Sequence, residues 1–253
     1  MKLSIVMPVF NERDTVEEIA RRVLAVDLPL EKELVIVDDG STDGTRDVLD
    51  RLGEMFGDER VRVIKHDRNR GKGAAVRTAI AATTGEFVII QDADLEYDPK
   101  DYAPMLEPLL DGRADVVFGS RFLGGPHRVL YFWHYVGNKM ITFLADAMYN
   151  INLTDMETCY KAFRGDVVRG LTLRSNRFGI EPELTAKVCR LKLRIYEVPI
   201  SYSGRSYEEG KKITWRDGLK AVGDCSIAHC GDSHLENAVP GSSSAWLGAA
   251  NRG

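Results

Sequence analysis

Several features that would place a sequence in a specialised class are missing here. The 253-residue chain has no run of about 18 apolar residues, so we expect no transmembrane helix. Its short apolar start is broken by Pro8 and Asn11, which argues against a signal peptide. Four cysteines in a chain of this length indicate a reduced, cytoplasmic protein. A net charge of −4 gives no reason to expect nucleic acid as a partner.

Familiar catalytic and metal signatures are missing as well. No G-x-G-x-x-G motif follows the first apolar run, which argues against a dinucleotide cofactor. No Ser-His-Asp or Cys-His arrangement is evident. The pattern of Cys225, His229, Cys230 and His234 lacks the spacing of a standard zinc finger and has no apolar frame, so we do not interpret it as a zinc site.

Short apolar runs alternate with helical patterns through the first half of the chain. The runs expected to form strands lie at 3–7, 33–39, 61–64, 87–92 and 115–119. Continuously apolar strands separated by helices predict an α/β fold with a mostly parallel sheet flanked by helices. Ligands of such sheets bind at the carboxyl ends of the strands, and here those ends carry polar residues.

The pattern changes after residue 120. The long aromatic stretch 128–150 predicts one or two amphipathic helices, which lie at a membrane interface or pack against the domain. A further helix is expected at 178–190 and a last strand at 193–200. We expect residues 1–222 to form one domain. Residues 223–253 are rich in Gly, Ser and Ala without a sustained period, which predicts a disordered or atypical tail.

Three carboxylates follow the apolar run 87–90 within a few residues: Asp92, Asp94 and Glu96. Residues two apart on an extended segment share a face, and hard oxygen ligands suit Mg²⁺ or Mn²⁺. A solvated turn with helix-capping aspartates is the alternative. The position at the end of a buried strand favours the metal.

Two glycine-rich segments lie at neighbouring strand ends. In "VDDGSTDGT" (37–45), a carboxylate could accept hydrogen bonds from a base or a ribose, or could form an Asx turn. "NRGKGAA" (69–75) is either a tight loop before a helix or a ligand contact. Arg121, Arg205, Lys211 and Lys212 could together form an anion site beside the carboxylates.

The motifs taken together resemble a known family. "SIVMPVFNE", "VDDGSTDGT", "NRGKGAAVRTA", "GEFVIIQDADLEYDP", "GSRF", "LTDMETCYKAFR" and "GRSYEEGKK" are similar, in this order, to family 2 glycosyltransferases of the inverting GT-A fold. The branch that the chain resembles contains dolichol-phosphate mannose and glucose synthases and their bacterial polyprenyl-phosphate relatives. The likeness covers about residues 1–222.

The resemblance implies roles for individual residues. The nucleotide base and ribose would be held by Pro8, Phe10, Glu12, Val37 and Asp39, and the nucleotide site would be lined by Asp92 and Ala93. Asp94 and Glu96 would hold the divalent metal. The residues at family positions that bind phosphates, which we expect to be catalytic together with Asp94, are Arg121, Arg205 and Lys211. The family more often has Gln at the position of Glu96, so this chain carries extra negative charge there.

The implied reaction moves a hexose from GDP-mannose or UDP-glucose to a polyprenyl phosphate. A phosphomonoester has a second pKa of about 6 and is largely dianionic at pH 7, so it needs cations and no base. The enzyme would then lie peripherally at the cytoplasmic face of a membrane. Two alternatives stay open. One is a family 2 transferase acting on a saccharide, with Asp155 or Glu157 as base. The other is a non-catalytic protein that binds sugar nucleotides.

Overall fold

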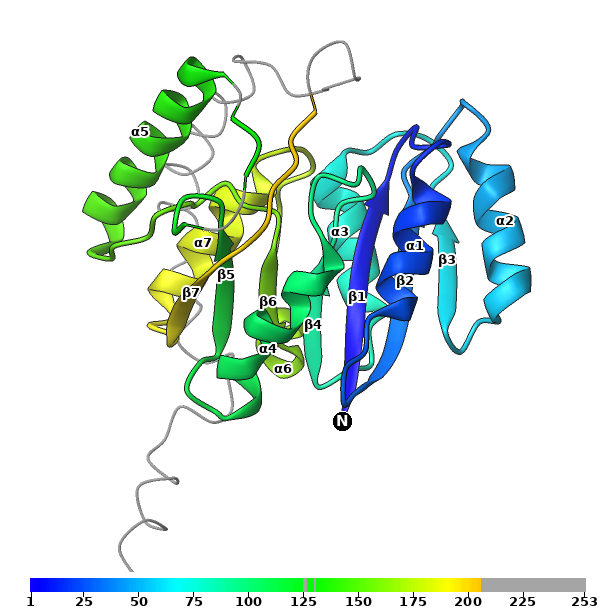
Figure 1. Cartoon of the computed structure of the whole chain (residues 1–253), viewed down its shortest axis with the longest axis horizontal. Coiled ribbons are helices and arrows are strands. Elements are labelled where there is room, and N and C mark those ends of the chain that lie inside the picture. The colour runs from blue at the N-terminus through cyan, green and yellow to red at the C-terminus, as the bar shows by residue number, and fades with distance from the viewer. Residues whose placement is uncertain (125–126, 130, 206–253) are drawn as a thin grey trace, which may run out of the picture.

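The computed structural model describes residues 1–124, 127–129 and 131–205. Its elements, in chain order, are β1 (Lys2–Val9), α1 (Val16–Ala25), β2 (Glu31–Asp38), α2 (Thr45–Phe56), β3 (Val61–Lys65), α3 (Lys72–Ala81), β4 (Phe87–Ile90), η1 (Pro99–Asp101), α4 (Tyr102–Leu110), β5 (Val116–Ser120), α5 (Phe132–Tyr149), β6 (Lys161–Arg164), α6 (Gly165–Gly170), α7 (Ile180–Arg190) and β7 (Ile195–Pro199). The strands form one sheet in the order β3-β2-β1-β4-β6-β5-β7 (Figure 1). The predicted α/β fold is confirmed. Lys211, the zinc-like pattern and the predicted tail lie outside the described residues.

One strand of the sheet runs against its neighbours. β1 pairs in parallel with β2 and β4, whereas the unpredicted β6 pairs antiparallel with both β4 and β5. Its four residues, KAFR, are too few to show a hydrophobic period. Because β6 runs in the opposite direction, its amino end lies at the edge formed by the carboxyl ends of the parallel strands.

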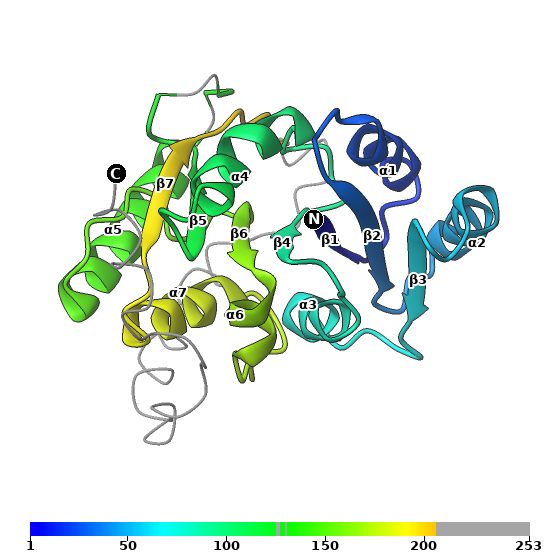
Figure 2. The same ribbon diagram turned by 90° about the horizontal axis from the view of Figure 1, so that it is seen from below.

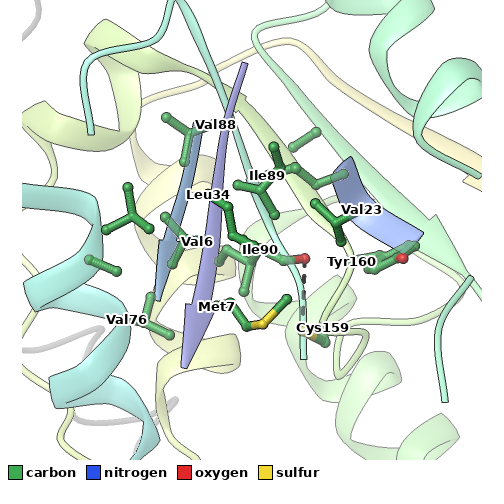
Figure 3. Close-up of a cluster of buried hydrophobic side chains, with 14 of the residues drawn as sticks. Val6, Met7, Val23, Leu34, Val76, Val88, Ile89, Ile90, Cys159 and Tyr160 are labelled. Atoms are coloured by element: carbon green, nitrogen blue, oxygen red, sulfur yellow. Dashed lines mark hydrogen bonds between the residues drawn. The ribbon is translucent and has the colours of Figure 1, made fainter. Parts of the chain in front are cut away.

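Helices cover both faces of the sheet. Figure 2 shows α1 and α4 on one face and α3, α6 and α7 on the other. The core between these layers is built from continuously apolar strands. Val6 of β1 and Val88 of β4 share one face of the sheet, and Val76 of α3 lies on that side, whereas Leu34 of β2 points to the other face (Figure 3). Burying each such side chain contributes about 1.5–3 kcal/mol, which is why both faces of these strands are apolar.

The helix α5 stands beside the end of the sheet formed by β5 and β7 and packs against α7 (Figure 1). It ends at Tyr149, and the following Asn150, with a φ of 53°, takes the left-handed conformation common after helices. Only Ile141, Thr142 and Ala145 of this helix are buried. Among the residues that the structure describes, no helix has the length and apolar character needed to cross a bilayer.

Candidate active site at the carboxyl edge of the sheet

A cavity of about 1510 Å³ opens at the carboxyl edge of the sheet. The residues expected at the site that line it are Pro8, Phe10, Glu12, Asp39, Asp92, Ala93, Asp94, Glu96, Arg121 and Arg205. Val37 does not line it, because its side chain is fully buried within β2. The fold therefore gathers residues up to about two hundred positions apart in sequence into one space, and Val37 belongs to the core beneath it.

The carboxylates after β4 come together through a turn. The strand ends at Ile90, and Leu95 takes the left-handed conformation with a φ of 62°. Asp94 Oδ1 accepts a hydrogen bond from the backbone N–H of Glu96 at 3.1 Å. The segment is therefore a turn and not the extended chain that we expect from the sequence, although Asp94 and Glu96 both face Arg205. The left-handed residue between them breaks the regular alternation of an extended chain.

Arg205 serves as a counter-cation to this acidic turn. Its guanidinium lies 3.2 Å from Glu12, 3.3 Å from Asp94 and 3.5 Å from Glu96. Burial and the neighbouring charges of Asp92 and Glu96 raise the pKa of Asp94 to about 7, and Arg205 opposes this rise. The turn thus concentrates more negative charge than one arginine neutralises.

These oxygen ligands suit a hard divalent cation whose coordination is completed by atoms of a bound ligand. Within residues 1–124, 127–129 and 131–205, no three His, Cys, Asp or Glu side chains gather closely enough to hold a metal ion. Asp94 and Glu96 provide two carboxylates, and Mg²⁺ is commonly bound by one or two carboxylates together with substrate phosphates. The chemistry of these side chains therefore fits Mg²⁺ or Mn²⁺ bound jointly with a diphosphate.

Asp39 holds the loop formed by the first residues of the NRGKGAA segment (69–75), just before α3. Its carboxylate accepts backbone hydrogen bonds from Arg70 and Gly71 at 2.9 and 2.7 Å, and His66 Nδ1 lies 2.7 Å from it. A Cβ on Gly71 would lie 2.2 Å from the backbone oxygen of Asn176, and its φ is 97°. The segment is therefore a tight packing loop, although Asn69 and Gly71 also line the cavity.

Lys72, the first residue of α3, links Asp92 in the cavity wall to a second carboxylate behind it. Its Nζ lies 2.9 Å from Asp92 and 2.8 Å from Glu181 of α7. Burial disfavours the charged lysine, but these carboxylates raise its pKa well above its usual value. The sequence gives no signal for this pairing, because Glu181 lies more than a hundred positions away and only its place on α7 brings it near.

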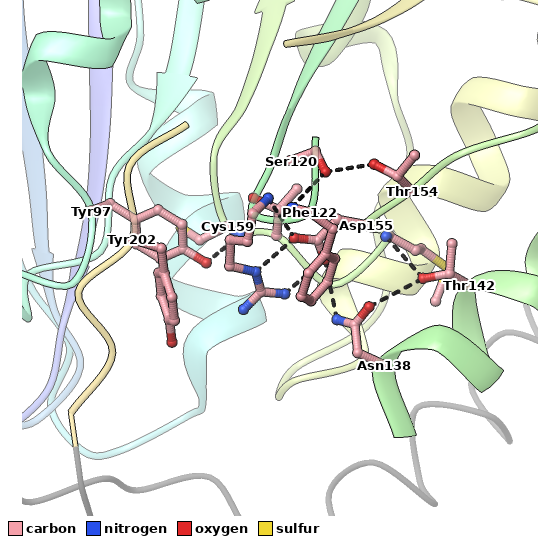
Figure 4. Close-up of polar contacts among 12 residues, drawn as sticks. Tyr97, Ser120, Phe122, Asn138, Thr142, Thr154, Asp155, Cys159 and Tyr202 are labelled. Carbon is pink, nitrogen blue, oxygen red and sulfur yellow. Dashed lines mark hydrogen bonds and ion pairs between the residues drawn. The ribbon is translucent and has the colours of Figure 1, made fainter. Parts of the chain in front are cut away.

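Arg121 is held by a buried partner. Its Nε and Nη2 lie 2.6 and 2.7 Å from the two oxygens of Asp155. Burial alone would raise the pKa of Asp155, but Arg121 holds it below its usual value. Asn138 of α5 donates to the same carboxylate at 3.1 Å (Figure 4). Among the described residues Arg121 Nη1 makes no hydrogen bond, so that amino group is available to an anion in the cavity.

The sequence matches the family model "Glycosyl transferase family 2" over residues 4–172. The chain belongs to this family. It is 31% identical to an undecaprenyl-phosphate mannosyltransferase from Micrococcus luteus over 83% of this chain and 87% of that protein. It is 29% identical to a dolichol-phosphate mannosyltransferase from Pyrococcus furiosus over 83% of this chain. The resemblance drawn from the motifs is confirmed.

The alignments span only part of some family members. The chain covers 59% of the length of the Pyrococcus furiosus protein and 62% of a dodecaprenyl-phosphate galacturonate synthase from Rhizobium johnstonii. Glucosyl-3-phosphoglycerate synthase from Mycobacterium tuberculosis, solved with Mn²⁺, UDP and glucosyl-3-phosphoglycerate, superposes with a TM-score of 0.70 at 22% identity. That match covers 92% of this chain and 81% of the other and shows that the GT-A fold is shared.

A family 2 transferase that uses a general base needs a free carboxylate in its cavity. Asp155 does not qualify, because both of its oxygens bind Arg121 and the residue does not line the cavity. Glu157 does line it. Burial and the charge of Glu181 raise the pKa of Glu157 to about 7, while Lys161 and Arg121 oppose the rise. Of the two residues considered as bases, only Glu157 can reach a ligand.

Proposed function

We propose that this chain transfers a hexose, with inversion, from a GDP- or UDP-linked sugar to a polyprenyl phosphate. One observation carries the proposal: a single cavity joins an acidic turn, an arginine and an apolar wall. The turn supplies Asp94 and Glu96, the arginine is Arg121, and the wall is the first part of α5. A nucleotide sugar and a lipid phosphate are the substrates that need these three surfaces together. The names of the undecaprenyl- and dolichol-phosphate mannosyltransferases among its relatives support this choice.

The nucleotide would bind over the ends of β1 and β2. Pro8 and Phe10 line that part of the cavity, and Phe10 is 37% exposed and offers a surface for a base. Asp39 already accepts three contacts, and a carboxylate has about four acceptor sites. One site therefore remains for a ribose hydroxyl. Asp92, held by Lys72, and Ala93 would line the diphosphate end of the nucleotide site.

Asp94 and Glu96 would hold Mg²⁺ or Mn²⁺ against the diphosphate. The metal would supply Lewis-acid stabilisation of the charge that develops on the leaving phosphate. The Mycobacterium tuberculosis neighbour with bound Mn²⁺ and UDP is consistent with this assignment. Arg205 contacts the same carboxylates and would turn toward the phosphates once another cation neutralises the turn.

The acceptor phosphate would bind beside Arg121. A dianionic phosphate is already a nucleophile, so the protein must bring it close to a second anion and orient it. Arg121 Nη1 and Arg205 would offset that repulsion, and Lys211 is the third cation we assign to this task. Catalysis would then depend on positioning and electrostatics, without a covalent intermediate on the protein.

The lipid part of the acceptor would lie along α5. Phe132, Trp133 and Phe143 are 65%, 77% and 69% exposed, and the first two also line the cavity. Exposed aromatic rings on one helix suit the interface of a bilayer. We infer a peripheral contact with the cytoplasmic face of a membrane, with the cavity open toward the lipid.

The direct test is transfer of radiolabelled hexose into an organic-soluble lipid phosphate. Purified protein is incubated with GDP- or UDP-linked sugars, Mg²⁺ or Mn²⁺, and polyprenyl phosphates of several lengths. We expect label in the lipid phase that depends on both metal and lipid phosphate. Label in a saccharide but in no polyprenyl phosphate would favour the saccharide-acceptor alternative. Sugar-nucleotide binding without turnover on any acceptor would favour a non-catalytic binding protein.

A further inference from the structure

One carboxylate in the cavity differs from the others. Among the described residues six carboxylates line it: Glu12, Asp39, Asp92, Asp94, Glu96 and Glu157. The first five each accept at least one hydrogen bond, from Thr15, Gly71, Lys72, Glu96 N–H and Tyr202 respectively. Glu157 accepts none from the described residues, and its Oε1 is buried without a partner.

The two cationic side chains near Glu157, Lys161 and Arg121, form their hydrogen bonds with other groups. Lys161 donates its Nζ hydrogens to the backbone oxygens of Met156 and Thr158. Arg121 forms its two strong bonds with Asp155. Leaving a buried acceptor unpaired costs about 1–3 kcal/mol, so a residue kept only for stability would normally be paired. The missing partner of Glu157 is therefore expected to arrive with a ligand.

The place of Glu157 in the sheet indicates which part of the ligand it faces. Asp39 follows β2, Pro8 lies on β1, Asp94 follows β4, and Glu157 precedes β6. These strands are adjacent in the order β2-β1-β4-β6, and the antiparallel β6 starts at the same edge where the others end. A nucleotide sugar laid along this edge, with its base over β2 and β1 and its diphosphate at β4, places its sugar before β6.

The chemistry of the substrates supports the same assignment. A carboxylate in a poorly solvated wall repels phosphate and gains nothing from an alkyl chain. The neutral hydrogen-bond donors of the substrates near this point are the hydroxyl groups of the hexose. Burial and Glu181 raise the pKa of Glu157 to about 7, so the carboxyl group can accept from or donate to a hydroxyl.

We propose that Glu157 forms the hexose subsite, where it hydrogen-bonds a hydroxyl group of the transferred sugar and discriminates between sugars. The inference rests on the proposed function and adds to it the residue that recognises the sugar. A site built to hydrogen-bond a substrate hydroxyl rejects analogues that lack it, because its own polar group is then left unpaired. The subsite therefore acts in donor binding and does not require Glu157 to remove a proton.

The experiment compares two ligands that differ only in the sugar. Binding of a nucleoside diphosphate and of the matching nucleotide sugar is measured by calorimetry with Mg²⁺, for wild type, Glu157→Gln and Glu157→Ala. We expect diphosphate affinity to stay within about twofold in both variants. Nucleotide-sugar affinity should fall about tenfold or more in Glu157→Ala and less in Glu157→Gln, which keeps one acceptor. Glu107→Gln, at an exposed glutamate outside the cavity, is the matched control.

The outcomes separate the inference from the proposed function. Equal sugar-nucleotide affinity in all variants would overturn the subsite, as would a fall in turnover alone with binding unchanged, which would indicate a base. If Glu157→Ala folds poorly, nucleotide sugars that lack single hydroxyl groups still test the subsite in Glu157→Gln. Removal of the bonded hydroxyl should reduce the affinity of Glu157→Gln less than it reduces the affinity of wild type. Sugar-dependent binding that needs Glu157, without transfer to any lipid phosphate, would contradict the proposed function alone.

Discussion

Arg121 and Asp155 form a two-bond ion pair at the wall of the cavity, with a partly exposed guanidinium and a completely buried carboxylate. The backbone N–H of Arg121 also donates to Asp155, at 3.1 Å. A cation that faces the cavity is therefore anchored by an anion that solvent does not reach. The pair joins the end of β5 to the segment before β6, two parts of the chain 34 residues apart.

Asp155→Asn tests the strength of this anchor. The variant leaves the arginine with a neutral partner in a poorly solvated wall, and breaking a buried pair costs about 3–5 kcal/mol. We expect the free energy of unfolding to fall by about 3 kcal/mol in urea denaturation. The control is Asp111→Asn, which removes a carboxylate beside the exposed Arg113 and should change stability little. Equal effects of the two substitutions would show that the buried pair contributes no special stability.

Gly73→Ala tests how closely the first turn of α3 approaches the backbone at Ser175. A Cβ at Gly73 would lie 2.3 Å from the backbone oxygen of Ser175, so one backbone must move. We expect a loss of about 2 kcal/mol or more in unfolding free energy. Gly53→Ala in α2 meets no atom closer than 3.9 Å and should stabilise the helix by up to about 1 kcal/mol. A stable Gly73→Ala variant would contradict the close approach of the two segments.

Asp94→Asn tests the assigned metal ligand. In wild type, Mg²⁺ or Mn²⁺ added with a nucleoside diphosphate should raise the melting temperature, because the ligand binds only the folded chain. We expect Asp94→Asn to lose the metal-dependent part of this shift and chelation to remove it from wild type. The control is Asp98→Asn, at a carboxylate four residues away that caps η1 and does not line the cavity. It should keep the metal-dependent shift. An unchanged shift in Asp94→Asn would refute the assignment.

The pH dependence of stability tests the environment of Glu157. Its pKa of about 7 lies above the value of about 4.3 for an unfolded glutamate. The folded chain then keeps a proton that the unfolded chain loses, so this contribution to stability is full below about pH 4 and disappears as the pH rises through about 7.

Glu157→Gln removes this titration. We expect the free energy of unfolding to fall less steeply between about pH 5 and pH 7 in the variant than in wild type, as measured by urea denaturation. The charged groups that face Glu157, namely Glu181, Lys161, Arg121 and Asp155, are the same in both proteins. Parallel slopes would show that Glu157 titrates at an ordinary value.

Trp133 and Phe143 test the membrane contact. Both side chains are largely exposed on α5, so their replacement by Ser should leave the fold intact. We expect Trp133→Ser/Phe143→Ser to sediment less with anionic phospholipid vesicles than wild type, by about tenfold in partition coefficient. Met55→Ser, at an exposed apolar residue of α2 on another helix, is the control. Equal partitioning of all three proteins would rule out α5 as the contact.

Much of the fold could be predicted from local patterns. The strands β1 and β2, within "SIVMPVF" and "ELVIVDD", are evident from the sequence. Both faces of a central parallel strand are buried, so its run of residues is continuously apolar. The β6 strand was missed because four residues carry no period and its pairing depends on β4 and β5. The turn at Leu95 was missed because a left-handed leucine has no sequence signal.

The sequence by itself determined the fold class, the family and the polar residues at the strand ends that line the cavity, because these follow from short motifs at the ends of apolar runs. The tertiary structure alone decided how those residues are paired. It paired Arg121 with Asp155 and Lys72 with Asp92 and Glu181, and among the described residues it left Glu157 Oε1 without a partner. Such pairings depend on distances between side chains far apart in the chain, and sequence patterns carry no record of those distances.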